Sequence, residues 1–139
     1  EPLFPGVGEG LRNLDRPPTA LGIATGKSRR GIVAGLERHG LRRHFVTVQT
    51  ADDGPGKPHP ELLLRAMADV GARPDETVLI GDTTYDMEMA VNAKIVGIGV
   101  AWGYHEPSEL RSSGAARIVD RFDDLPAALA AVSEARACD

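Results

Sequence analysis

The sequence is poor in aromatic residues and in cysteine, and its acidic residues outnumber its basic ones, 20 to 16. Aromatic side chains make up 4% of the 139 residues, so the core must be built mainly from leucine, isoleucine, valine and alanine. The single cysteine, Cys138, cannot form an internal disulfide, and the four histidines are too scattered for the spacing of zinc ligands. The formal net charge of -4 argues against a nucleic-acid partner, because nucleic-acid-binding domains carry a basic surplus.

Long apolar runs are also missing. No stretch approaches the length of a transmembrane helix, and the N-terminus has neither the basic start nor the apolar stretch of a signal peptide. We therefore expect a soluble, cytoplasmic protein without a membrane partner. Apolar residues make up 42% of the chain and predict a packed core, and the length fits one domain, residues 1–139.

Short apolar runs alternate with helical patterns along the chain. The predicted strands are residues 21–25, 45–49, 77–80, 95–100 and 117–119. The predicted helices are residues 28–39, 60–70, 85–93, 107–113 and the Ala-rich segment from 126 onward. Residues 51–60, dense in Asp, Gly and Pro, are a predicted loop. Apolar strands that alternate with helices predict an α/β fold with a mainly parallel sheet covered on both faces.

Polar residues follow three successive predicted strands. Thr25 and Gly26 follow the first strand, Lys57 lies in the loop after the second, and Asp82 and Asp86 follow the third. Ligands of open parallel sheets bind outside the carboxyl ends of the strands, so we expect these groups at one edge. A hydroxyl and helix-start N–H groups can hold phosphate oxygens, a lysine can offset phosphoryl charge, and carboxylates can hold Mg²⁺. The combination predicts a phosphoryl site.

Each of these residues also has a purely structural explanation. Thr25 could cap the following helix, Lys57 could be a solvated loop lysine, Asp82 could be an N-cap, and Asp86 could be a solvated acid of the first turn. If the helix begins near Asp82, both carboxylates point to one side of its first turn. Taken singly, most of these residues are better explained structurally, and only their combination at three strand ends favours a phosphoryl site.

The same residues resemble three of the four short motifs of the haloacid dehalogenase-like (HAD) hydrolase superfamily. Segment 21–26 (LGIATG) resembles the second motif, segment 57–61 (KPHPE) the third and segment 78–86 (VLIGDTTYD) the fourth, in the family's order and spacing. The flanks 5–7 (PGV) and 99–104 (GVAWGY) resemble the phosphoglycolate phosphatase-like branch. The resemblance covers nearly the whole chain, and the Gly-Asp form of the fourth motif is that of the phosphatases.

The resemblance implies a three-layer Rossmann-like core, Mg²⁺ as cofactor and a small phosphorylated metabolite as substrate. By position, Thr25 would hydrogen-bond a phosphoryl oxygen, with Gly26 beside it, and Lys57 would stabilise the charge of nucleophile and phosphate. Asp82 would be a magnesium ligand, and Asp86 would hold magnesium waters or orient Lys57.

Two features depart from the family pattern. The opening motif, an apolar strand followed by Asp-x-Asp-Gly-Thr, does not occur in the 139 residues, and its first Asp is the family's nucleophile. The nearest match, DDGP at residues 52–55, lies just before Lys57 and is predicted to be a turn. Lys94 stands where the family has glycine, at the turn into the fourth predicted strand.

The missing motif implies a core without its central first strand and without the helical cap that usually follows it. That strand would lie between the strands that end at Thr25 and Asp82. We therefore expect the chain to be the C-terminal part of a phosphatase, with little or no activity alone. Direct pairing of the two strands, an N-terminal segment, or another chain, as in a homo-oligomer, would fill the gap.

Three other functions stay open at this stage. Residues 22–28 (GIATGKS) resemble a nucleotide-binding P-loop, but three residues separate the glycines where that motif needs four. A non-catalytic interaction or regulatory module derived from a HAD fold would self-associate, and metal would not change its stability. A phosphatase for a nucleotide, pyridoxal phosphate or a sugar phosphate would share every core motif, because the cap selects the substrate.

Overall fold

A computed structural model describes residues 7–103 and 105–137. Cys138, the first two residues of the PGV flank and Tyr104 lie outside the described residues. The chain divides into two compact units, Glu1–Ala72 and Arg73–Asp139, and each is described by itself.

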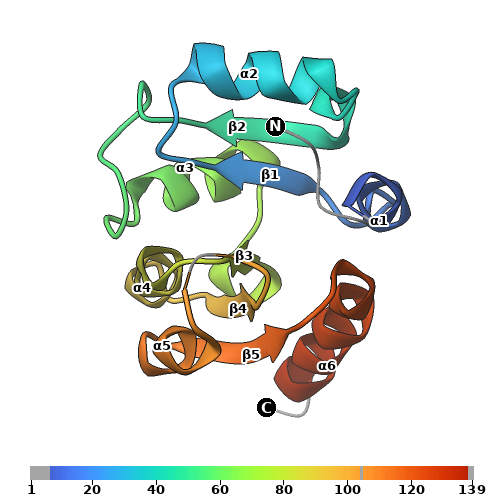
Figure 1. The fold of residues 1–139 in the computed structure, drawn as a ribbon, viewed down its shortest axis with the longest axis vertical. Helices are drawn as coiled ribbons and strands as arrows, with labels where there is room; N and C mark the ends of the chain where they lie inside the picture. The colour runs from blue at the N-terminus through green and yellow to red at the C-terminus, as the bar shows by residue number, and fades with distance from the viewer. Residues whose placement is uncertain (1–6, 104, 138–139) are drawn as a thin grey trace. The chain divides into compact units, whose positions relative to one another are not determined.

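The first unit holds a two-stranded parallel sheet with helices on both faces (Figure 1). Its elements are α1 (Val7–Leu14), β1 (Leu21–Ala24), α2 (Arg29–Arg38), a 3-10 turn (Arg42–His44), β2 (Phe45–Gln49) and α3 (Glu61–Val70). The helix α2 begins after Ser28, whose hydroxyl accepts the N–H of Gly31 at 3.2 Å. This side-chain bond satisfies a backbone donor that the helix start leaves without an intrahelical partner.

The two faces of this sheet differ in character because successive strand side chains point to opposite sides. Val48 of β2 is buried in an apolar cluster with Leu36 of α2. Thr47 and Gln49 are buried on the other face, where both donate to one carboxylate oxygen of Asp69 in α3, at 2.7 and 2.8 Å. Thus α2 is held by apolar packing, and α3 is held partly by a polar contact.

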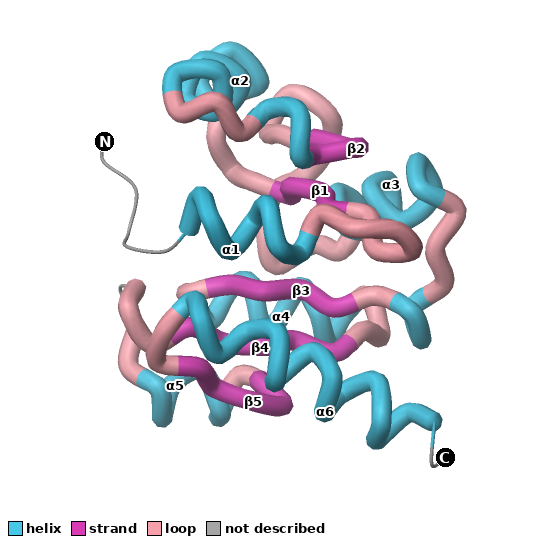
Figure 2. Tube along the Cα trace, turned by 90° about the vertical axis from the view of Figure 1, so that its right-hand side faces the viewer, coloured by secondary structure: helices cyan, strands magenta, loops and turns pink. Residues whose placement is uncertain are grey.

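The second unit is a three-stranded parallel sheet in the order β3-β4-β5. Its elements are a 3-10 turn (Pro74–Glu76), β3 (Val78–Gly81), α4 (Thr84–Asn92), β4 (Val96–Val100), α5 (Pro107–Ser112), β5 (Ala115–Val119), a 3-10 turn (Phe122–Asp124) and α6 (Leu125–Ala137). Within this unit α6 lies on one side of the strands and α4 on the other (Figure 2).

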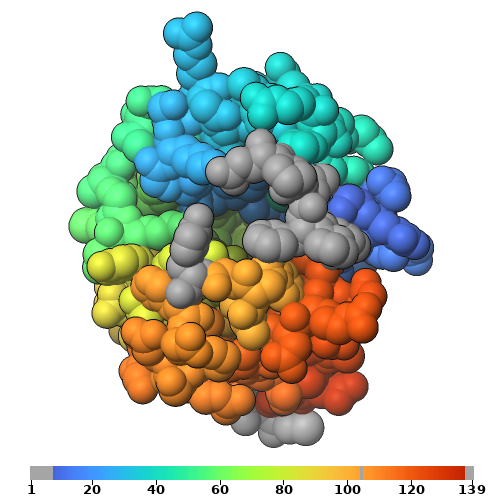
Figure 3. Space-filling model, in the orientation of Figure 1, coloured from blue at the N-terminus to red at the C-terminus, as the bar shows by residue number. Residues whose placement is uncertain are grey.

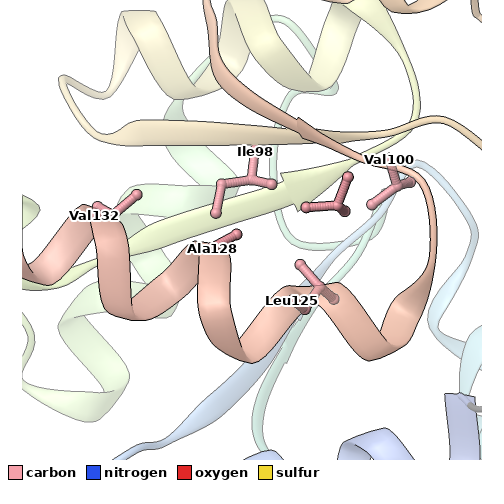
Figure 4. Packing of buried hydrophobic residues seen from close by; sticks show 6 residues of the cluster. Ile98, Val100, Leu125, Ala128 and Val132 are labelled. Carbon is pink, nitrogen blue, oxygen red and sulfur yellow. The ribbon is translucent and has the colours of Figure 1, made fainter.

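The core of the second unit lies between β4 and α6. Ile98 and Val100 of β4 point toward Leu125, Ala128 and Val132 of α6 (Figure 4). Ile98 is 0% exposed and Leu125 is 1% exposed. Burying one such side chain stabilises a fold by about 1.5–3 kcal/mol, so this contact is a main source of the unit's stability.

The α/β fold with parallel strands is confirmed in both units. Every predicted strand and helix is present, with bounds within two residues of those predicted, and α1 is an additional helix. In the described part of the chain, β1 and β3 are end strands of different sheets. None of the helices described there is long and apolar enough to span a membrane.

Lys94 closes α4 in a left-handed backbone conformation, with φ of 63°. Its N–H donates to the carbonyl of Val91 at 3.0 Å, and the N–H of Ile95 donates to that of Ala90 at 2.9 Å, which is the Schellman pattern. A non-glycine residue in this conformation costs roughly 1–2 kcal/mol. We therefore expect Lys94→Gly to raise the free energy of unfolding by about 1 kcal/mol and the melting temperature by about 3–5 °C. Thermal unfolding monitored by circular dichroism measures this.

The matched control is Lys94→Ala, which removes the same side chain but keeps a β-carbon in the left-handed conformation. It should show no comparable gain. An equal gain in both variants would mean that the lysine side chain, and not the backbone conformation, is the unfavourable feature.

Candidate functional site

In the first unit, Thr25 follows β1 and stays paired with β2. Its N–H donates to the carbonyl of Gln49 at 3.0 Å, so the parallel ladder continues past the end of β1. Its hydroxyl accepts the N–H of Lys27 at 3.2 Å. Ser28 is the N-cap of α2, so the alternative explanation that Thr25 caps this helix is wrong. The Thr25 hydroxyl still has a proton to donate to a ligand.

The other predicted phosphate-binding residues of this unit are Gly26 and Lys57. Gly26 is exposed, and no atom lies within 4 Å of the point where a β-carbon would stand, so the backbone beside Thr25 is open to a ligand. Lys57 is half-buried in the loop between β2 and α3. The green part of the chain in Figure 3, which includes this loop, lies at the surface. The unit therefore carries a hydroxyl and an ammonium on the loops after its two strands.

In the second unit, Asp82 and Asp86 follow β3. Asp82 lies just before Thr83, and Thr83 is the N-cap of α4. The alternative explanation of Asp82 as the N-cap is therefore wrong, and the condition under which Asp82 and Asp86 would share a first helical turn is not met. Asp86 is 4% exposed, so it is not a solvated acid either.

Asp86 and Thr83 hold each other in a capping box. The N–H and the hydroxyl of Thr83 donate to Oδ2 of Asp86 at 3.1 and 2.9 Å, and the N–H of Asp86 donates to the Thr83 hydroxyl oxygen at 3.1 Å. A buried carboxylate is costly unless hydrogen bonds compensate for its lost hydration. The capping box supplies this compensation and fixes the rotamer of Asp86.

The backbone of a glycine packs against each of the two aspartate side chains. A β-carbon on Gly81 would stand 2.5 Å from Cγ of Asp86, and one on Gly103 would stand 2.6 Å from Cγ of Asp82. Both distances are far inside van der Waals contact. Each aspartate therefore occupies space that only glycine leaves open.

Carboxylate oxygens such as those of Asp82 and Asp86 are ligands of the kind that a hard cation takes. Within residues 7–103 and 105–137, no group of three or more His, Cys, Asp or Glu side chains could hold a metal ion. Asp82 and Asp86 would thus supply only part of a coordination shell. Mg²⁺ accepts such a partial shell, because it keeps several waters and takes one or two carboxylates.

Sequence reasoning missed His105, which contacts the start of α4. Its Nδ1 accepts the N–H of Thr84 at 2.9 Å, and its ring lies 6.1 Å from that of Tyr85, centre to centre. The ring nitrogen thereby satisfies a backbone donor of the first turn of α4, close to Asp86. The contact joins residues 21 positions apart, so no local pattern in the sequence shows it.

Sequence reasoning also missed Arg29, Asp53 and Thr83. Arg29 and Asp53 form an ion pair 24 positions apart, which no local pattern shows. Thr83 could have been found, because Thr-x-x-Asp before an apolar helix is a recognisable capping-box pattern.

Comparisons with known proteins place the chain in one family. The model of the family "Haloacid dehalogenase-like hydrolase" matches residues 2–100. The "Probable phosphatase IndB" of Dickeya dadantii is 41% identical over 124 residues, which are 88% of this chain and 54% of that protein. The "Pyrophosphatase PpaX" of Oceanobacillus iheyensis is 33% identical over 123 residues, which are 88% of this chain and 58% of that protein.

A phosphoglycolate phosphatase and a solved structure complete the comparison. The "Phosphoglycolate phosphatase" of Salmonella choleraesuis is 32% identical over 128 residues, which are 91% of this chain and 51% of that protein. The crystal structure of a hydrolase from Pseudomonas syringae superposes with a TM-score of 0.84 at 33% identity, covering 94% of this chain and 61% of the other. The chain thus spans about half the length of the curated relatives that it matches.

Proposed function

The chain belongs to the haloacid dehalogenase-like hydrolase family, and on this basis we propose that it forms part of a Mg²⁺-dependent phosphatase for small phosphate esters. The observation that carries the proposal is the pair of carboxylates after β3. Asp86 is buried and bonded to Thr83, and glycine backbone leaves room for both Asp82 and Asp86. Carboxylates that hold a metal ion are themselves oriented by hydrogen bonds, as Asp86 is by Thr83.

Each site residue has a role that its chemistry supports. The Thr25 hydroxyl and the open backbone at Gly26 would donate to phosphoryl oxygens, and Lys57 would offset the negative charge that phosphoryl transfer concentrates. Asp82 and Asp86 would hold Mg²⁺. When bound, Mg²⁺ would polarise a phosphoryl oxygen and offset part of its charge.

We propose that the nucleophile comes from a segment outside these 139 residues. The Asp-x-Asp-Gly-Thr pattern that would supply it does not occur in them. A phosphoryl site with a cation and hydrogen-bond donors but no nucleophile can bind phosphate and cannot form a phosphoenzyme. This chain alone should therefore hydrolyse phosphate esters slowly or not at all.

A small, phosphoglycolate-like ester is the proposed substrate, and the cytoplasm is the proposed compartment. Proteins named phosphoglycolate phosphatase and pyrophosphatase are similar to the chain to nearly the same degree. A substrate panel therefore needs phosphoglycolate, pyrophosphate, a nucleoside monophosphate, pyridoxal phosphate and a sugar phosphate.

A joined protein tests the proposal. The part of the Dickeya phosphatase that the match leaves out would be fused to this chain in place of the matching part. We expect the joined protein to hydrolyse p-nitrophenyl phosphate in the presence of Mg²⁺, and we expect the 139-residue chain alone to show at most a small fraction of that rate. Phosphate release from both proteins, with and without a chelator, is the measurement.

Three results would contradict the proposal. Hydrolysis at enzyme-like rates by the chain alone would show that it needs no outside nucleophile. A folded but inactive fusion, beside an active Dickeya protein, would show that this chain does not supply the phosphoryl site. Self-association of the chain, with no effect of Mg²⁺ on its stability, would favour the non-catalytic module.

A further inference from the structure

Two adjacent aspartates tie the loop after β2 to the start of α2. The backbone N–H of Arg29 donates to Oδ2 of Asp52 at 2.8 Å, and the guanidinium of Arg29 donates to Oδ2 of Asp53 at 2.6 Å. The first bond holds the backbone of Arg29, which lies in the segment that follows Thr25, and the second bond holds the Arg29 side chain. The loop that carries Lys57 is therefore bonded twice to the segment that continues from Thr25.

Asp53 is the centre of this network. The same oxygen that accepts from Arg29 also accepts the N–H of Thr50 at 2.7 Å and the Thr50 hydroxyl at 2.8 Å. Arg29 donates in addition to the carbonyl of Val48 at 2.7 Å. The hydroxyl and N–H of Thr50, with the guanidinium of Arg29, hold the pKa of Asp53 below its usual range. The carboxylate is therefore ionised at neutral pH, and its bonds are charge-assisted.

Backbone hydrogen bonds also join the segment after β1 to the segment after β2. The N–H of Thr25 donates to the carbonyl of Gln49 at 3.0 Å, and the N–H of Ala51 donates to that of Lys27 at 3.1 Å. The segment after β1 and the segment after β2 thus run together past the sheet edge. Lys57 follows on the second of these segments.

Stability alone is a weak explanation for the network. The side chains of Arg29 and Asp53 are 44% and 25% exposed, and exposed ion pairs contribute only about 0–1 kcal/mol. Geometry is a stronger explanation, because the bonds converge on the place where two loops with a hydroxyl and an ammonium leave the sheet. Groups of a binding site must be held within about 0.5 Å of their working positions, so small displacements of the two loops would weaken ligand binding.

We propose that Arg29 and Asp53 are positioning residues that hold Thr25 and Lys57 as a single phosphate-binding unit. This inference rests on the proposed function, since it takes Thr25 and Lys57 as the phosphate-binding groups. It adds that neither residue binds phosphate well unless the ion pair fixes the distance between their loops.

The experiment is a titration of the 139-residue chain with inorganic phosphate, followed through the backbone amide signals of Thr25 and Lys57 by NMR. In the unmodified chain both signals should shift with one common midpoint, that is, the same phosphate concentration should give half of the full shift for each signal. In Asp53→Ala the midpoint should rise about tenfold or more, and the two signals should no longer share it. Arg29→Met should do the same, whereas Arg29→Lys keeps the charge opposite Asp53 and should restore part of the affinity.

The matched control is Asp75→Ala, which removes the carboxylate of another exposed ion pair, Arg73–Asp75 at 3.0 Å in the second unit. It makes the same charge change and should leave both midpoints unaltered. A common, unchanged midpoint in folded Asp53→Ala and Arg29→Met would overturn the inference and leave the phosphate site standing. No response of Thr25 and Lys57 in the unmodified chain would overturn the phosphate site itself, and the inference with it. Should Asp53→Ala not fold, Arg29→Met and Arg29→Lys decide the outcome.

Discussion

Lys57→Met in the joined protein should lower kcat for p-nitrophenyl phosphate by about a hundredfold to a thousandfold. The proposed role of Lys57 is to offset charge that grows during phosphoryl transfer, and a fixed ammonium does this best where water is partly excluded. Lys57 is half-buried, which agrees with that role. Methionine keeps the length and the apolar stem of the side chain and removes the charge. Steady-state hydrolysis is the measurement, with circular dichroism to show that the variant folds.

The matched control is Lys27→Met. Lys27 is also a lysine of the first unit, but it is exposed and lies between Thr25 and the start of α2. Its replacement makes the same charge change and should lower kcat less than about threefold, since exposed charges are largely screened. If Lys27→Met abolished activity and Lys57→Met did not, the third-motif assignment would be wrong. ATP binding that required Lys27 would then revive the P-loop alternative.

Gly81→Ala should disturb the metal site by displacing Asp86, without replacing either of the two proposed ligands. The new β-carbon would stand 2.5 Å from Cγ of Asp86, which is 4% exposed and bonded to Thr83. Overpacking of this kind destabilises a fold by about 1–3 kcal/mol. Asp86 must shift to make room, and this shift strains the capping box with Thr83. We therefore expect a lower melting temperature and a Mg²⁺ midpoint for thermal stabilisation raised about tenfold to a hundredfold.

The matched control for this variant lies on the neighbouring strand. A β-carbon on Gly97 would stand 3.1 Å from Sδ of Met87, the flexible end of an unbranched side chain. Gly97→Ala should therefore lower stability slightly and leave the Mg²⁺ midpoint unchanged. Equal Mg²⁺ midpoints in the two variants would show that the contact between Gly81 and Asp86 does not serve the metal site.

Local signals in the sequence were enough to predict most of the elements. The strand at residues 45–49 was predicted to its ends, because an apolar, β-branched run lies between a helix and a loop rich in Asp, Gly and Pro. Gly71, in the left-handed backbone conformation, ends α3 at the point where the predicted helix of residues 60–70 ends. The helix α1 was not predicted, although Val7, Leu11 and Leu14 stand at helical spacing; the segment is only eight residues long and contains two glycines, which lower helix propensity.

The candidate site was predicted at the level of single residues and not at the level of their surroundings. The order of Thr25, Lys57 and Asp82 along the chain follows from strand ends, which are local features. The contacts that hold these residues are not local: Arg29 reaches Asp53, His105 reaches Thr84, and the backbone at Gly103 lies against Asp82. Contacts between residues so far apart cannot be predicted from local patterns in a single sequence, so only the structure shows them.

The strand order has a consequence for how the chain is made. In the part of the chain that the structure describes, each strand pairs only with the strand next to it in the sequence: β1 with β2, β3 with β4 and β4 with β5. When residue 72 has been translated, the strands β1 and β2 and the helices α1, α2 and α3 of the first unit have all been synthesised. Parallel pairing forms more slowly than local helical contacts, but all of the pairing partners of this sheet lie within the first unit, and domains generally fold in the order of their synthesis. The first sheet can therefore form on the ribosome while the second is still being translated.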